Sequence, residues 1–269
     1  MNKLSWNQAE LEHLKNNFSS NQDKSLSVFL NKSPNAIRIK ASRLNLKKYS
    51  QIYRNSLELT QDEEQVILGS LMGDLHSTIT HTSKNARLEG GHSKNQREYL
   101  LYKINLLQRL KWSVRSGKDG IYYESKSFSC LNQYHNLFYP NKKKTLNKST
   151  LDKIGKLGLL IWYMDDGTYH KRDRRSYLHT NCFSYDEQLI IQEYFEEKWG
   201  IHNKIYISKG KDKYNGRIWY YLSFPVSETI KLHDLFRDFE IPECMKYKFY
   251  YNHESYLPKS ISGVLVTHN

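Results

Sequence analysis

The 269-residue chain has few cysteines, no long apolar run and too few acids to balance its basic residues. Its three cysteines, Cys130, Cys182 and Cys244, lie far apart and form no Cys-x-x-Cys pair. This pattern argues against a disulfide framework and a zinc site, and favours reduced thiols. The longest uncharged apolar run, Leu157–Met164, is too short to cross a bilayer, and the chain begins without an apolar signal core. We therefore predict a soluble, intracellular protein.

The shortage of acids leaves a large positive charge. The chain has 41 lysines and arginines against 28 aspartates and glutamates, a net charge of +13 at pH 7. A positive field of this size favours a polyanionic partner over a role in solubility alone. A chain of 269 residues is long enough for one large domain or two to three small ones, and its 38% of hydrophobic residues can build a core.

Residues 1–48 have the pattern of three short helices. Ser5 or Asn7 can cap the first helix, and Ser33 followed by Pro34 marks the start of the third. A short second helix, a tight turn and a basic third helix are typical of a helix-turn-helix domain, whose last helix enters the major groove. A protein-binding module with a solvated basic face is the alternative. The outward face of the third helix is expected to carry Asn35, Arg38, Ser42 and either Lys40 or Arg43. In the DNA-binding interpretation, Asn35, Arg38 and Arg43 contact DNA.

Residues 49–60 are predicted to be a linker, because their charge is mixed and no period persists. Thr60 can then cap a helix that runs through Gly69 and Gly73 to Asp74. Each glycine inside a helix costs about 1 kcal/mol relative to alanine. We therefore expect another helix backbone to approach this helix closely.

The rest of the chain repeats one order of elements. Residues 61–150 and 151–255 each have the pattern α-β-β-α-β-β-α, and a tail of residues 256–269 follows. An internal duplication explains this repeat and predicts an α+β pair of pseudo-two-fold related half-domains with antiparallel sheets. The expected strands are 76–82, 87–92, 111–116, 121–130, 168–171, 177–183, 204–208 and 219–224.

Each half begins with an apolar helix that ends in an acid. The first, QVILGSLMGDLHST, ends in Asp74, and the second, KLGLLIWYMDDGTY, ends in Asp165 and Asp166. A carboxylate at a helix C-terminus faces the negative end of the helix dipole, and two such carboxylates repel each other. Mg²⁺ between them would offset that cost and could activate water against a phosphate. Two ordinary solvated acids are the alternative, but their repetition in a basic chain favours a metal site formed by Asp74 and Asp166.

The segments ILGSLMGDL and LLIWYMDDG resemble the two motifs of the single-chain LAGLIDADG homing endonucleases. The sequence WNQAEL…SPNAIRIKASRLNL also resembles Myb-like helix-turn-helix modules. In the endonuclease family the motif helices pack at the pseudo-two-fold axis, and their last acids hold the catalytic Mg²⁺ ions at the scissile phosphates. The resemblance implies that Asp74 and Asp166 have this role, with Asp165 as a weaker candidate.

Two departures from the family motif concern packing. The first motif ends in Leu75, where the family often has glycine. The second motif has Ile161 and Asp165 where the first has Gly69 and Gly73. Because the second helix lacks glycines at these positions, we expect the close packing to be asymmetric.

Each half ends in a basic segment, KKKTL and MKYKF. A lysine near a scissile phosphate can stabilise the charge of the transition state or activate water through its neighbours, although most lysines beside a helix are simply solvated. The family places a basic residue near each active site, in segments resembling these. The resemblance implies catalytic roles for Lys144 and Lys248, with Lys143 and Lys246 as alternatives one or two positions away.

The family reads DNA with the concave faces of two saddle-shaped sheets in the major groove. Polar residues at alternate strand positions suit base edges, and flanking lysines and arginines suit phosphates. The segment HKRDRR (170–175) is the best candidate for a phosphate-contacting loop. The predicted DNA-binding residues in the two halves are Thr78, Thr80, Thr82, Lys84, Arg87, Lys126, Arg172, Arg174, Arg175, His179, Lys204, Lys209, Lys211, Lys213 and Arg217.

These observations predict a monomeric, Mg²⁺-dependent endonuclease that cuts both strands of double-stranded DNA at one long asymmetric site. No intein splicing block flanks the motifs, which favours an intron-encoded or free-standing enzyme. One alternative is an RNA maturase, in which the same fold binds intron RNA. Another is a DNA-binding regulator without cleavage, which the presence of both acids disfavours.

Overall fold

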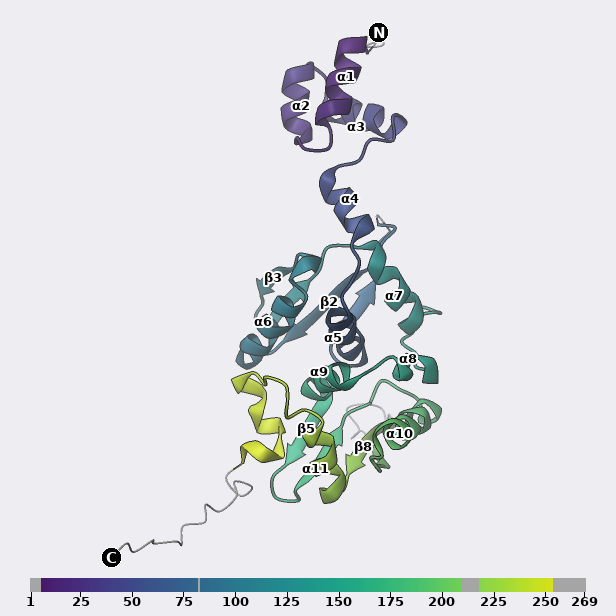
Figure 1. The fold of residues 1–269 in the computed structure, drawn as a ribbon, viewed down its shortest axis with the longest axis vertical. Helices are drawn as coiled ribbons and strands as arrows, with labels where there is room; N and C mark the ends of the chain where they lie inside the picture. Colours follow the sequence, from purple (N-terminus) through teal and green to yellow (C-terminus); the bar gives the residue numbers. More distant parts are fainter. Residues whose placement is uncertain (1–5, 82, 210–217, 254–269) are drawn as a thin grey trace, which may run out of the picture. The chain divides into compact units, whose positions relative to one another are not determined.

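The chain divides into two compact units, one of residues 1–58 with 128–130 and one of 59–127 with 131–269. The structure, a computed structural model, describes residues 6–81, 83–209 and 218–253 (Figure 1). Among these residues, every helix is too short or too polar to cross a membrane.

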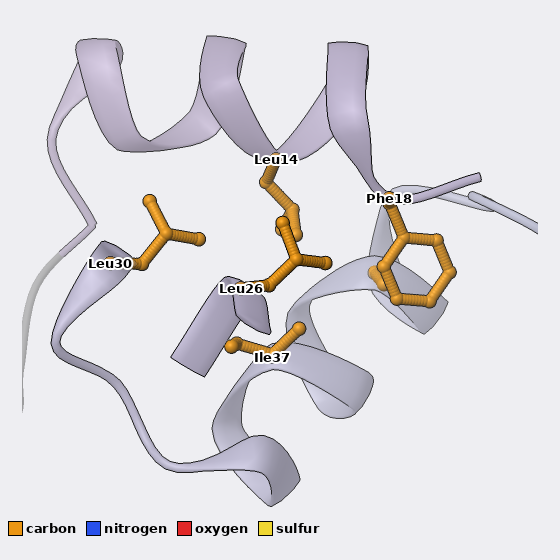
Figure 2. Close-up of a cluster of buried hydrophobic side chains, with 6 residues drawn as sticks. Leu14, Phe18, Leu26, Leu30 and Ile37 are labelled. Atoms are coloured by element: carbon orange, nitrogen blue, oxygen red, sulfur yellow. The ribbon is translucent and has the colours of Figure 1, made fainter. Parts of the chain in front are cut away.

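The smaller unit contains the three predicted helices, α1 (Gln8–Asn17), α2 (Asp23–Leu30) and α3 (Pro34–Arg43). Asn7 caps α1 through a capping box with Glu10. The Ser33 side chain caps α3 by accepting a hydrogen bond from the Ala36 N–H. Figure 2 shows the apolar side chains of all three helices pointing toward one another, and this core consists of Leu14, Phe18, Leu26, Leu30, Ile37 and Ala41.

The stretch predicted to be a linker contains a fourth helix, α4 (Tyr49–Ser56). Ser129 Oγ donates a hydrogen bond to the Asn55 carbonyl at 2.9 Å, and the Tyr53 ring meets the Phe128 ring edge-on at 5.9 Å. The expectation of no regular period was wrong here. Tyr49, Ile52 and Tyr53 form one helical face that is only eight residues long, too short to stand out in the sequence.

The larger unit contains two antiparallel four-stranded sheets with equivalent strand orders, β1-β2-β4-β3 and β5-β6-β8-β7. This shared order confirms the predicted α+β pair of related halves. The strands of the first sheet are β1 (His76–Thr78), β2 (Arg87–His92), β3 (Ser113–Ser116) and β4 (Ile121–Glu124). Those of the second are β5 (Gly167–His170), β6 (Arg175–Leu178), β7 (Lys204–Lys209) and β8 (Ile218–Phe224).

Several strands end earlier than predicted. Strand β4 stops at Glu124, because the Lys126 N–H turns away to the carbonyls of Leu110 and Lys111. Strand β6 stops at Leu178, and the following residues form a turn in which the Phe183 N–H reaches the Thr180 carbonyl.

The two motif helices, α5 (Gln61–Met72) and α9 (Lys156–Asp166), pack against each other at the centre of this unit. In Figure 1 the first sheet with α6 and α7 lies on one side of the pair, and the second sheet with α10 and α11 on the other. The remaining helices are α6 (Arg97–Leu106), α7 (Asn132–Phe138), α8 (Lys148–Asp152), α10 (Tyr185–Trp199) and α11 (Val226–Asp234). Short 3₁₀ segments cover Lys94–Gln96, Gln108–Leu110, Ser129–Leu131, Glu243–Lys248 and Tyr250–Asn252.

Glycines on both motif helices allow the close approach of α5 and α9. A Cβ atom on Gly69 would lie 2.1 Å from the Gly158 carbonyl oxygen, and one on Gly158 would lie 3.1 Å from the Gln65 carbonyl oxygen. A Cβ atom on Gly73 would lie 2.5 Å from the Asp165 Cβ. The packing is asymmetric as expected, but the second helix does supply a glycine, Gly158, about one turn before the aligned position.

Candidate functional site

Asp74 and Asp166 lie at the carboxyl ends of the two motif helices. Asp166 is the last residue of α9, and Asp74 directly follows Gly73, which caps α5. Burial, together with the charges of Asp165 and Asp74, raises the pKa of Asp166 to about 8. Burial and the charge of Asp165 also raise the pKa of Asp74. The two carboxylates therefore share a site in which their negative charge is incompletely compensated.

A lysine from each half lies beside each helix end. Lys144 Nζ donates to the carbonyl oxygens of Met72 and Gly73, at 3.1 and 3.2 Å. Lys248 Nζ donates to those of Met164 and Asp165, at 2.6 and 3.1 Å. Each ammonium has three N–H donors, so two carbonyls leave one donor for another acceptor. The two alternative lysines have other environments: Lys143 is exposed, and Lys246 is paired with Glu243.

Asp165 has a different environment from Asp74 and Asp166. Its side chain is fully buried, and its Oδ1 accepts hydrogen bonds from Tyr99 Oη at 2.8 Å and Lys103 Nζ at 2.9 Å. Its Oδ2 accepts from the backbone N–H of Asp74 at 3.2 Å. Burial disfavours the charge of Lys103, but the charge and hydrogen bond of Asp165, together with Tyr123 and Asp74, outweigh this and raise the Lys103 pKa. Asp165 thus joins α9 to α6 and to the end of α5.

His92, at the end of β2, faces Asp74. Its side chain is 1% exposed, and its Nδ1 lies 3.6 Å from Asp74 Oδ2. The other ring nitrogen, Nε2, lies 3.2 Å from Tyr123 Oη. Burial and the charge of Lys103 lower the pKa of His92 to about 4, against the opposing effects of Asp165 and Gln96. The imidazole is therefore neutral at pH 7.

These groups fit a divalent cation. One ligand atom from each of Asp74, His92 and Asp165 lies within 4.8 Å of the others. Both oxygens of Asp165 already accept hydrogen bonds, which leaves Asp74 and His92 as the open members of that cluster. The raised pKa of Asp166 marks a further carboxylate that a cation would stabilise.

The first sheet presents charged and polar side chains on its exposed face. The register places His76 opposite Glu89, Glu89 opposite Glu124, and Thr78 opposite Arg87. Arg87 pairs with Glu89 at 3.0 Å and with Glu124 at 3.1 Å, so this predicted phosphate contact is already engaged with two carboxylates.

A hollow of about 480 Å³ lies over this face and reaches Asp74. His76, Glu89, Arg115 and Tyr122 contribute to its lining. The other predicted contacts in this half lie at the edges of the sheet. Thr80 and Lys84 lie between β1 and β2, and Lys126 follows β4.

The second sheet presents a different, aromatic face. Tyr221 of β8 lies 6.0 Å from the Tyr177 ring of β6 and 5.7 Å from the Tyr206 ring of β7, and His170 meets Tyr177 edge-on at 5.0 Å. The backbone N–H of His179 donates to the Asp166 carbonyl at 3.0 Å. The exposed basic residues of this half include Arg172 and Arg174 between β5 and β6, Arg175 at the start of β6, and Lys204 at the start of β7.

Some predicted DNA contacts lie elsewhere in the chain. Asn35, Arg38 and Arg43 are exposed on α3, where Arg38 pairs with Asp23 at 2.7 Å. Lys209 is the last residue of β7. Thr82, Lys211, Lys213 and Arg217 fall outside the described residues.

A sequence model of the LAGLIDADG DNA endonuclease family matches residues 64–232, which include both acidic motifs and both sheets. The chain belongs to this family.

Individual relatives are similar in sequence to parts of this LAGLIDADG protein. It is 34% identical over 128 residues to "Probable intron-encoded DNA endonuclease 3" of Mycosarcoma maydis, covering 47% of this chain and 88% of that one. It is 28% identical over 208 residues to "Protein RecA" of Mycobacterium gastri, covering 71% of this chain and 47% of the relative. It is 27% identical over 185 residues to "Cytochrome b mRNA maturase bI2" of Debaryomyces hansenii, covering 62% of this chain and 68% of the relative. The chain thus spans less than half of the RecA relative.

A solved structure has the same fold. The homing endonuclease I-WcaI, determined bound to its DNA recognition sequence, matches 75% of this chain and 92% of its own with a TM-score of 0.63 at 18% identity. At this identity the likeness establishes the fold and nothing further.

Tyr99, Lys103 and His92 are parts of the site that the sequence did not predict. Lys103 carries a signal in retrospect, because it falls on the buried face of α6, four residues after Tyr99. A lysine in an apolar stripe needs a buried partner. His92 carries a weaker signal, as a polar residue at an inward position of a strand.

Proposed function

We propose that this LAGLIDADG protein is a site-specific endonuclease that hydrolyses one phosphodiester bond in each strand of double-stranded DNA, with Mg²⁺ as its physiological metal ion. The observation that carries this proposal is the repetition of one chemical group at both helix ends. Asp74 with Lys144 and Asp166 with Lys248 each combine a raised-pKa carboxylate with a lysine at the helix carbonyls.

The chain's own residues would share the chemistry as follows. Asp74 and Asp166 would hold the divalent ions, which when bound polarise the phosphate and activate water. Each lysine keeps one N–H donor directed away from the helix carbonyls, and this donor can stabilise negative charge on the phosphate during attack. Asp165 fixes the backbone N–H of Asp74 and so holds the two helix ends in one arrangement.

The two sheet faces and the net charge of +13 support duplex DNA as the substrate. The first face carries carboxylates, histidine and arginine, whereas the second carries a row of tyrosines. Two chemically different faces suit a target whose two halves differ in sequence. The smaller unit, with its exposed basic α3, would add phosphate contacts.

The test uses a DNA fragment that carries the host locus without the intron or gene that encodes this chain. With Mg²⁺ we expect one double-strand break within that fragment, and none with EDTA. Specific binding without any cleavage would contradict the nuclease proposal and favour a DNA-binding regulator.

The similarity to a cytochrome b mRNA maturase supports a second candidate, assistance of intron splicing. The same protein, incubated with its own intron RNA, distinguishes the two. Faster splicing together with an uncut intronless locus would assign the chain to the maturase class.

A further inference from the structure

We propose that His92 is a ligand, together with Asp74, of the divalent ion in the first half of the site, and that this pair binds Mn²⁺ in the DNA-free protein. The inference concerns the same site as the proposed function and rests on it for its biological meaning. At the equivalent position of the second half, the described residues place a threonine, Thr180, so the two metal sites differ in chemistry.

The first observation is the unsatisfied ring nitrogen. Nδ1 of His92 is buried and has no hydrogen-bond partner among the described residues. A buried polar atom without a partner is costly, and it marks a place where an ion or another group binds. Nδ1 faces Asp74 Oδ2 at 3.6 Å, which is too long for a hydrogen bond.

The 3.6 Å separation suits two ligands of one metal ion. Two ligand atoms that each lie about 2.0–2.2 Å from a shared ion, at an angle of about 90–110° at the ion, are separated by about 2.8–3.6 Å. The carboxylate of Asp74 is 39% exposed, so it opens toward solvent and substrate, while His92 approaches from the protein interior.

The second ring nitrogen has the partner that a ligating histidine needs. Nε2 lies 3.2 Å from Tyr123 Oη, and a proton on Nε2 can be donated to that hydroxyl. The lone pair then lies on Nδ1, facing Asp74. Metal-bound histidines typically donate their other N–H to a polar group, which fixes the ring and its tautomer.

The nearby positive charge does not prevent metal binding. Lys103 Nζ lies 2.9 Å from Asp165 Oδ1, and this ion pair is buried on both sides. Asp165 therefore neutralises Lys103, which leaves the carboxylate of Asp74 available to a cation.

The equivalent position in the second half is Thr180. The strand pairing of the two sheets shows this equivalence. His76 pairs with Glu89 in the first sheet, and Thr168 pairs with Tyr177 in the second. His92 lies three residues after Glu89, and Thr180 lies three residues after Tyr177. Thr180 is fully buried, and its hydroxyl donates to Gln188 Oε1 at 2.6 Å. Thr180 has no nitrogen in its side chain, and its hydroxyl is engaged with Gln188, so this position offers no imidazole ligand to an ion near Asp166.

This difference predicts different metal preferences. Imidazole nitrogen is a better ligand for Mn²⁺ and later transition metals than for Mg²⁺, which prefers oxygen. The site at Asp74 should therefore favour Mn²⁺ over Mg²⁺ more strongly than the site at Asp166.

The experiment is a Mn²⁺ titration of the full chain without DNA, followed by electron spin-echo envelope modulation of the bound ion. We expect the ¹⁴N modulation of a directly coordinated imidazole in the wild type. Asp74→Asn and His92→Gln should remove it, and His92→Gln should weaken Mn²⁺ binding at this site by at least about 10- to 100-fold, since loss of a mere hydrogen-bond partner of a ligand already costs that much. Asp166→Asn and His179→Ala should retain the modulation.

Asp74→Asn keeps the test informative if His92→Gln fails to fold, because Asp74 is partly exposed. Absence of Mn²⁺ binding, absence of ¹⁴N modulation in the wild type, or its loss in His179→Ala would overturn the proposal. A wild type that cuts DNA with Mg²⁺ but shows no modulation would overturn only the role of His92. Modulation without cleavage of the intronless locus would leave His92 as a ligand and contradict the endonuclease.

Discussion

Lys144 and Lys248 occupy equivalent places in the two halves, although their sequence separation from the motif acids differs. Each Nζ donates to the last two carbonyls before the motif acid, those of Met72 and Gly73 or those of Met164 and Asp165. The relationship spans 71 or more residues in each half, so it depends on the fold and not on local sequence.

Substituting either lysine should slow the cleavage of one DNA strand. We expect Lys144→Met and Lys248→Met each to reduce cleavage of one strand by about 10²- to 10³-fold, the usual effect of losing one donor to a transition-state oxygen. Nicked DNA should accumulate, and the two variants should nick opposite strands. Denaturing gels with each strand labelled measure this. Lys143→Met and Lys246→Met are the matched controls, and equal slowing by these would contradict the assignment.

The buried pair of Lys103 and Asp165 should be important for stability. Lys103→Met leaves an uncompensated buried carboxylate and should lower the free energy of unfolding by about 3–5 kcal/mol. The double variant Lys103→Met/Asp165→Asn removes both charges, so its loss should be clearly smaller than the sum of the two single losses. Urea unfolding of the three variants measures this coupling. Additive losses would show that the two side chains do not interact.

Close packing of the motif helices should not tolerate a methyl group at Gly158. Gly158→Ala places a Cβ 2.8 Å from Gln65 Oε1 and 3.1 Å from the Gln65 carbonyl oxygen. We expect a loss of about 1–3 kcal/mol, as for other overpacked cores, together with slower cleavage because both helix ends move. Gly200→Ala is the control, since Gly200 has φ +62° and open space around it. It should cost about 1–2 kcal/mol from backbone strain without changing cleavage of folded protein.

The stability of the metal-free protein should fall with rising pH through the titration of Asp166. Its pKa is raised from the ordinary 3.8 to about 8 by burial, Asp165 and Asp74, against Lys144 and Lys248. Between these values the folded state keeps a proton that the unfolded chain has lost, so this contribution is greatest below pH 4 and is lost as pH rises through 8. Mg²⁺ competes with that proton, so its stabilising effect should grow with pH.

Melting temperatures of the wild type and Asp166→Asn, measured from pH 5 to 9, test this linkage. In EDTA, the melting temperature of Asp166→Asn should rise relative to that of the wild type as pH rises. A constant difference across this range would contradict the raised pKa.

The smaller unit should contribute to DNA affinity through charge. Removal of one phosphate contact, as in Arg43→Gln, should weaken binding uniformly across sequences and reduce the salt slope of log Kd by about 1. Lys15→Gln changes the net charge equally but lies on α1. Fluorescence anisotropy at several salt concentrations measures both variants, and an equal effect of Lys15→Gln would argue against a specific role of α3.

Features set by local chemistry could be predicted from the sequence. Thr60 caps α5 and Ser33 caps α3, as expected from residue type alone. Gly200 ends α10 in the left-handed conformation that glycine favours. The duplication was visible because the two motifs retain the same residue pattern. The helix α4 was missed because eight residues carry little periodicity.

Features set by long-range contacts could not be predicted. Asp165 lies 62 residues from Lys103, and only the packing of α6 against the motif helices brings them together. The role of Gly158 depends on the crossing of two helices, so alignment of the motifs placed the expected glycine contact one turn away. His92 reads as one polar residue in a strand until the fold places it beside Asp74.

Strand-resolved cleavage of the intronless locus by Asp74→Asn and Asp166→Asn tests the central claim most directly. We expect each variant to bind the target with an affinity near that of the wild type but to make no double-strand break in Mg²⁺. If either variant cut both strands at the wild-type rate, the assignment of these two acids as the metal-binding centre would be wrong.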